Sequence, residues 1–210
     1  MLTLVENTEE YREIARVCRT CITETCEDLR SGHQLKAVPI SLGNLRYMLM
    51  AKDTKGTYHV YYYIAFMKYP QDQLKKPRQT RLLVHKLLSA AVKRRYKVEN
   101  RQPLHELRYK FTTGRGKSID LHVGILANDK RNSYYLISYD KDELAFTWTE
   151  LKRKIQTYPK MLKQLKENRR IEELRKLYIN KLSDKTYSKV PAISIWKECV
   201  DALYYHKEEQ

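Results

Sequence analysis

The chain has 210 residues, 42% of them hydrophobic, and its 41 lysines and arginines against 25 aspartates and glutamates give a formal net charge of +16. This length and apolar content support a folded domain with an ordinary core and exclude wholesale disorder. No apolar run approaches the ~18 residues of a membrane-spanning helix, and the N-terminus lacks the basic start of a secretory signal, so we expect an intracellular protein without a membrane span.

The charge is unevenly distributed along the chain. Residues 1–33 hold seven acids and four bases, a net charge of −3, which leaves +19 for the rest. Such an excess repels itself unless counterions or a polyanion neutralise it. The leading expected partner is therefore nucleic acid, DNA or RNA, and an anionic membrane surface is the second.

The first expected element is a helix that begins at Asn7 or Thr8 and ends near Ser31, where Gly32 can stop it. Its apolar residues recur at helical spacing, which predicts that one face packs on a core. Three cysteines lie on that face, and together with His33 they have the spacing C-x2-C-x4-C-x6-H: Cys18, Cys21 and Cys26. This set could supply four zinc ligands. Because the intervening residues continue the helical period, we favour reduced core thiols over zinc.

Three strands are expected next, over residues 34–42, 45–51 and 57–67. The last two form a hairpin across a turn whose Gly56 suits a positive φ. The third strand, TYHVYYYIAFM, is rich in tyrosine. One of its faces must lie in the core, and the other is available for stacking on unpaired bases, although sheet propensity alone also favours tyrosine here.

A basic amphipathic helix is expected over residues 78–101, because Leu83, Leu87, Ala90 and Ala91 share one side at helical spacing. Its other side and its last turn are crowded with cations. These either contact nucleic acid or form a solvated face that complements the helix dipole. We predict the nucleic-acid contact, made by this helix and by a later loop through the following residues: Arg78, Arg81, Lys86, Lys93, Arg94, Arg95, Lys97, Arg115 and Lys117.

That later loop, TTGRGKS, joins expected strands over residues 107–112 and 119–127, and the second of these forms a hairpin with residues 133–139. The letters GKS end a phosphate-binding loop motif, but Phe111 stands where the motif needs its first glycine, and the following residues alternate like a strand. The sequence therefore argues against ATP or GTP hydrolysis. It leaves a basic loop that clasps a backbone phosphate, or a plain hairpin turn.

A catalytic alternative is a Mg²⁺-dependent nuclease built on Glu106, Asp120 and His122. Asp120 and His122 stand two apart on one strand and so face the same side, and Glu106 lies at the start of an adjoining strand. The pattern lacks the acid-x-Lys step that usually accompanies such sites, and Asp120 has an ordinary explanation as an exposed hairpin residue.

From residue 142 onward the chain is expected to be helical, over residues 142–157, 160–181 and 193–206. We therefore predict an α+β fold: a largely antiparallel sheet from two hairpin-containing segments, one basic helix packed on it, and a helical C-terminal region. We expect residues 1–141 to form the α+β core and residues 142–210 to form the helical region, packed on the same domain. The predicted function is nucleic-acid binding without a cofactor. The alternatives are the nuclease, which would use Mg²⁺, and an assembly subunit that binds protein partners.

Overall fold

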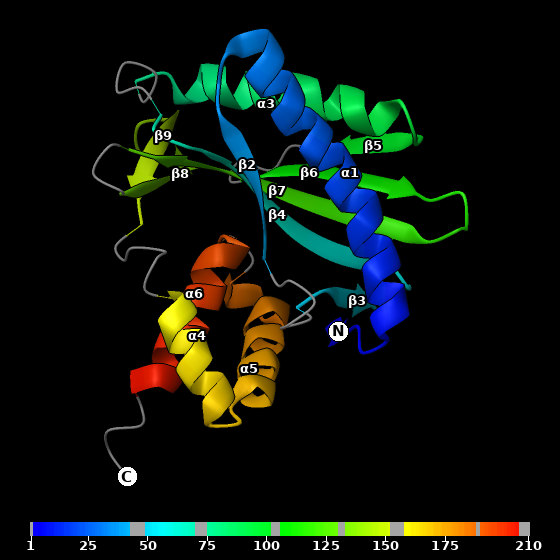
Figure 1. The fold of residues 1–210 in the computed structure, drawn as a ribbon, viewed down its shortest axis with the longest axis vertical. Coiled ribbons are helices and arrows are strands. Elements are labelled where there is room, and N and C mark those ends of the chain that lie inside the picture. The colour runs from blue at the N-terminus through cyan, green and yellow to red at the C-terminus, as the bar shows by residue number, and fades with distance from the viewer. Residues whose placement is uncertain are drawn as a thin grey trace.

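The computed structural model describes residues 2–42, 49–69, 75–101, 106–129, 133–151, 158–187 and 190–205. A nine-stranded open sheet runs in the order β1-β3-β4-β7-β6-β5, while β2 also pairs with β4, and β8 and β9 extend the sheet from β7 (Figure 1). The strands are β1 (Leu2–Leu4), β2 (Ala37–Ser41), β3 (Ala51–Asp53), β4 (Tyr58–Phe66), β5 (Val98–Arg101), β6 (Leu107–Thr112), β7 (Ser118–Asn128), β8 (Tyr134–Asp140) and β9 (Ala145–Glu150). The helices of the described ranges are α1 (Thr8–His33), α3 (Pro77–Lys93), α4 (Tyr158–Glu167), α5 (Ile171–Ser183) and α6 (Ala192–Tyr205), with a 3-10 turn at Lys185–Tyr187. The fold is mixed α+β.

The centre of the sheet is a parallel pair, β4 with β7, whose register runs from Tyr58 opposite Ile119 to Phe66 opposite Ala127. The other strand pairs are antiparallel. The chain between β4 and β7 forms α3 and then the strands β5 and β6, which lie beyond β7 in the sheet. The two hairpin-containing segments are therefore joined side by side in the same direction, which strand patterns alone do not reveal.

Both faces of β4 are buried, because helices cover the sheet on either side. The face with Tyr58, Tyr62 and Phe66 packs in one core with α1 and α3. The opposite face, with Tyr61 and Tyr63, packs in a second core with α4, α5 and α6. The expectation of tyrosine rings presented to bases is therefore wrong, since the side chains of all four tyrosines of β4 are buried.

The first helix follows its expected course. The Asn7 side chain accepts hydrogen bonds from the backbone N–H groups of Glu9 and Glu10, so Asn7 is its N-cap. The helix runs past Gly32 and ends where Gln34 takes a left-handed conformation, with φ 56°. Its cysteines are buried in the core as free thiols, and among the described residues they form no metal-binding group with His33, so the zinc alternative finds no support.

Several expected boundaries are wrong, two of them because the residues form a hairpin with a neighbouring strand instead of continuing a helix. The basic helix ends at Lys93, and residues 98–101 form β5, where Val98 lies opposite Phe111 and Tyr96 stacks on the same ring at 4.7 Å between centroids. The expected helix over residues 142–157 is instead β9 at residues 145–150, paired with β8; residues 152–157 lie outside the described ranges. The expected helix over residues 160–181 is broken near Arg169, whose φ is 59°. Of the expected strand at residues 45–51, residues 45–48 are not described.

The C-terminal helices are fixed to the sheet by Tyr63. Its hydroxyl accepts a hydrogen bond of 2.9 Å from the backbone N–H of Ile193 at the start of α6. The Tyr63 ring lies over Gly124, its register partner on β7, which has no side chain to obstruct it. Figure 1 shows α4, α5 and α6 grouped apart from α3. Within the described ranges, none of the helices combines the length and the apolar character needed to cross a membrane.

Candidate metal centre

A cluster of polar side chains lies where the parallel pair begins, on the sheet face that the C-terminal helices also occupy. The register places His59 opposite Asp120 and Tyr61 opposite His122. Since side chains alternate along a strand, these four residues share one face. On the other side of β7, Arg108 of β6 lies opposite His122.

Three of these side chains converge on one point. His59 Nδ1 lies 3.4 Å from His122 Nε2 and 3.8 Å from Asp120 Oδ2, and His122 Nε2 lies 3.5 Å from Asp120 Oδ1. One ligand atom from each residue fits within 4.8 Å of the others. We call His59, Asp120 and His122 the metal cluster.

Two carboxylates bind the outer nitrogens of the histidine rings. Glu106 Oε1 lies 2.5 Å from His122 Nδ1, and Asp53 Oδ2 lies 3.4 Å from His59 Nε2. With a proton on each outer nitrogen, both inner nitrogens present lone pairs toward the centre. Such carboxylate–histidine pairs are typical around metal ions, because they fix the tautomer and the orientation of the ring.

Asp120 is held by Arg108. Its carboxylate accepts hydrogen bonds of 2.8 and 3.0 Å from Arg108 Nε, and Arg108 Nη2 donates another. Burial raises the pKa of Asp120, but the bonds from Arg108 and the nearby histidines outweigh burial and leave the pKa below its ordinary value. Asp120 is therefore ionised at neutral pH.

His59 is suited to remain neutral. Burial, and then the neighbouring His122, lower the pKa of His59, while Asp120 and Asp53 raise it by less. Only the neutral ring can offer a lone pair to a cation. Two imidazoles with one carboxylate suit zinc, manganese or iron better than Mg²⁺, which prefers oxygen ligands throughout. The residues present thus fit a transition metal ion.

The structure brings together the three residues named from the sequence, Glu106, Asp120 and His122. It adds two that were missed, His59 and Asp53. Their sequence signal was weak, because His59 lies within the tyrosine-rich strand and meets Asp120 only through the parallel pairing. Asp53 lies in the turn before β4, where its side chain accepts hydrogen bonds from the N–H groups of Lys55 and Thr57, so its position alone indicates a turn residue.

The predicted nucleic-acid-binding residues do not form one exposed basic surface. Glu24 of α1 pairs with Arg94 and Arg95, and Glu13 pairs with Arg115 and Lys117, so the acidic N-terminal helix neutralises much of the positive charge. Arg81 is 5% exposed and donates to the backbone oxygen of Glu106. The remaining four are exposed on α3 or just beyond it: Arg78, Lys86, Lys93 and Lys97.

No protein-family model matches the chain, and no curated protein matches its sequence. Solved structures do match. One is DncV of Vibrio cholerae bound to 3'-deoxy ATP, at 12% identity and a TM-score of 0.54, covering 96% of this chain and 68% of that one. Another is DncV of Escherichia coli bound to 3'-deoxy GTP, at 11% identity and a TM-score of 0.55, covering 100% and 70%. A V. cholerae di-nucleotide cyclase mutant in complex with ATP and GTP matches at 11% and 0.53, covering 96% and 70%.

These comparisons correct the functional prediction. The structures named above are those of DncV and a di-nucleotide cyclase, and another match is a cyclic AMP-GMP synthase; none of these is described as a nucleic-acid-binding protein, a nuclease or an assembly subunit. The three structures hold ATP, GTP or a 3'-deoxy form of one of them. The missing phosphate-binding loop predicts only that this chain does not hydrolyse ATP or GTP. The chain shares the fold of these nucleotide-binding cyclases.

Proposed function

We propose that this protein is a metal-dependent enzyme that binds a nucleoside triphosphate on the sheet face carrying the metal cluster. The observation that carries the proposal is the pair of inward-facing histidine nitrogens beside an ionised aspartate, each ring held by an outer carboxylate. The fold supports the choice of substrate, since the matching cyclases are described with ATP or GTP. A bound divalent ion would neutralise phosphate oxygens.

The chain's own residues would supply binding and orientation. His59, His122 and Asp120 would hold the ion, while Glu106 and Asp53 fix the two rings. The Arg108 side chain is 32% exposed. Its hydrogen bonds to Asp120 raise the Arg108 pKa by more than burial lowers it, so the pKa lies above its ordinary value and the side chain keeps its positive charge. It would therefore meet a phosphate group at the edge of the cluster.

The test is to measure metal binding first and nucleotide chemistry second. Titration calorimetry with Zn²⁺, Mn²⁺ and Mg²⁺ should show one site that prefers Zn²⁺ or Mn²⁺. His59→Gln and Asp120→Asn should weaken metal binding by about tenfold or more. His33→Gln, which changes an exposed histidine at the end of α1, is the matched control and should bind as the unchanged protein does. Equal metal binding by His59→Gln and the unchanged protein would refute the site.

Nucleotide chemistry is tested by incubating ATP and GTP with the metal-loaded protein and separating the products by chromatography. Product formation that is lost in both cluster variants supports the enzyme.

A second candidate function is nucleotide binding without turnover. This second function is favoured by the hydrogen bonds from Arg108 to the Asp120 carboxylate, because Arg108 competes with a metal ion for that carboxylate. Metal-free nucleotide binding at this face, with no product under any metal, would select this second function and reject the enzyme.

A further inference from the structure

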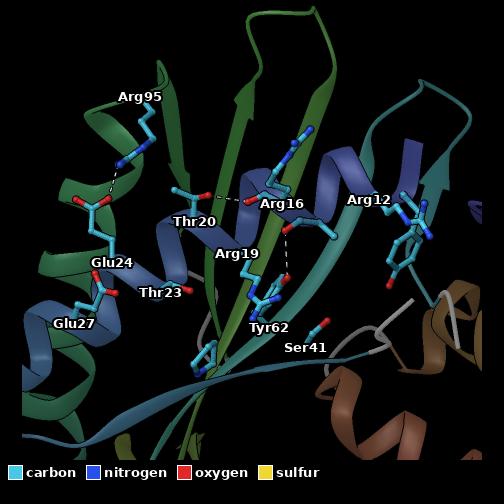
Figure 2. Close-up of a pocket in the computed structure, with 13 residues that line it drawn as sticks. Arg12, Arg16, Arg19, Thr20, Thr23, Glu24, Glu27, Ser41, Tyr62 and Arg95 are labelled. Atoms are coloured by element: carbon cyan, nitrogen blue, oxygen red, sulfur yellow. Dashed lines mark hydrogen bonds and ion pairs between the residues drawn. The ribbon is translucent and has the colours of Figure 1, made fainter. Parts of the chain in front are cut away.

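A groove of about 930 Å³ lies between α1 and strands β2 and β4 (Figure 2). Its floor includes Pro39 and Ser41 of β2 and Tyr62 of β4. Tyr62 belongs to the β4 face that packs with α1, whereas His59 and Tyr61 belong to the other. The groove is therefore on the opposite side of the sheet from the metal cluster. Its volume is in the range of small-molecule sites.

Three arginines of α1 line this groove: Arg12, Arg16 and Arg19. They stand four and three residues apart, so they follow one side of the helix over about 10 Å. All three are exposed. Figure 2 shows Arg19 beside Tyr62, whose hydroxyl donates to the backbone oxygen of Ala15 at 3.3 Å.

Three acids of α1 pair with cations of other elements and not with these arginines. Glu10 and Glu13 bind Lys117, and Glu24 binds Arg94 and Arg95. By contrast, within the described part of the chain, no ion pair joins a carboxylate to Arg12, Arg16 or Arg19. Cations of other elements therefore neutralise Glu10, Glu13 and Glu24, whereas the three arginines keep their positive charge at one end of the groove.

The far end of the groove has a different character. Glu24, held by Arg95 at 2.5 Å, and the exposed Glu27 lie there, with Thr20 and Thr23 between them and the arginines (Figure 2). A ligand that fits this arrangement carries several negative charges at one end and hydrogen-bond donors at the other. A nucleoside polyphosphate has both, and arginine binds phosphate groups with paired hydrogen bonds.

We propose that this groove is a second nucleotide site, which binds the phosphates of a nucleoside polyphosphate through Arg12, Arg16 and Arg19 and needs no metal ion. The site does not depend on the function proposed for the metal cluster, since the sheet separates the two.

The test measures ATP binding by calorimetry in the presence of EDTA, which removes metal from the cluster. The double variant Arg12→Gln/Arg19→Gln should bind ATP at least about 100-fold more weakly, because each charged hydrogen bond lost is worth about tenfold or more. Arg30→Gln removes one exposed positive charge of the same helix outside the groove and should bind ATP as the unchanged protein does.

Two further probes identify what the groove recognises. Inorganic triphosphate should bind in EDTA, whereas adenosine should bind much more weakly than ATP. Hydrogen exchange should slow in α1 and β2 when ATP is added. The proposal is overturned if no ATP binds in EDTA, if the double variant binds ATP unchanged, if Arg30→Gln loses as much affinity, or if adenosine binds as well as ATP.

Discussion

Replacing Gly124 by alanine tests the joint between the sheet and the C-terminal helices. A Cβ atom at this position would lie 2.5 Å from Cδ1 of the Tyr63 ring, and Tyr63 is buried. Overpacking of this kind costs about 1–3 kcal/mol. Displacing the ring also breaks the 2.9 Å hydrogen bond to Ile193, worth about 1 kcal/mol. We expect Gly124→Ala to lower the free energy of unfolding by about 2–4 kcal/mol.

Urea unfolding followed by circular dichroism measures this loss as a shift of the midpoint, provided that the slope is unchanged. The matched control is Gly32→Ala. Gly32 lies inside α1 with nothing within 4 Å of its missing Cβ, so alanine should stabilise the protein by about 0.5–1 kcal/mol. An unchanged midpoint for Gly124→Ala, or equal losses in the two variants, would refute the reasoning.

Three further outcomes are expected. Arg108→Gln leaves the carboxylate of Asp120, which is 3% exposed, without its main partner. Because the Arg108 side chain is 32% exposed, the free energy of unfolding measured in urea should fall by about 2 kcal/mol, which is less than for a fully buried pair. A fall near zero would contradict the role of the pair. Glu10 has a pKa below its ordinary value, because the Tyr58 hydroxyl and, after an opposing effect of burial, Lys52 stabilise its charge. The contribution of Glu10 to stability is therefore present above the unfolded-state pKa and is lost as the pH falls through the lower folded-state pKa. The difference in the free energy of unfolding between Glu10→Gln and the unchanged protein should be clear at pH 7 and should close below about pH 4. A difference that stays constant with pH would contradict this. Asn7→Ala removes the cap of α1 and should cost about 1 kcal/mol in thermal unfolding, whereas an unchanged melting temperature would show that the cap contributes nothing.

The elements that could be predicted from the sequence are those stabilised by nearby residues. The first helix has its cap and its apolar stripe within one segment, and β6 at residues 107–112 alternates between buried and less buried positions. The hairpin of β3 and β4 turns at Gly56, whose φ is 79°. In each case the interactions that decide the structure lie within a few residues of one another.

The elements that could not be predicted depend on strand pairing that local residue patterns do not show. Residues 98–101 continue a helical run of cations, yet they form a strand because β6 offers them an edge. The same holds for β9 beside β8. At the candidate site, Asp120 and His122 were found from their spacing on one strand, whereas His59 required knowledge of the parallel register. The ion pairs of α1 with α3 were equally hidden, and they decide how much charge remains exposed.

The parallel β4–β7 pair has a consequence for how the protein folds. It joins residues about sixty positions apart, as in the contact between Thr57 and Ser118, which are 61 residues apart in the chain. Strand pairings of such high contact order form slowly, because a long loop must close, at a cost in chain entropy, before any stabilising contact forms. The metal cluster draws His59 from β4 and both Asp120 and His122 from β7, so it cannot assemble before these strands meet. On the ribosome, therefore, more than half of the chain must emerge before the cluster can exist, and its assembly reports that the centre of the sheet has closed.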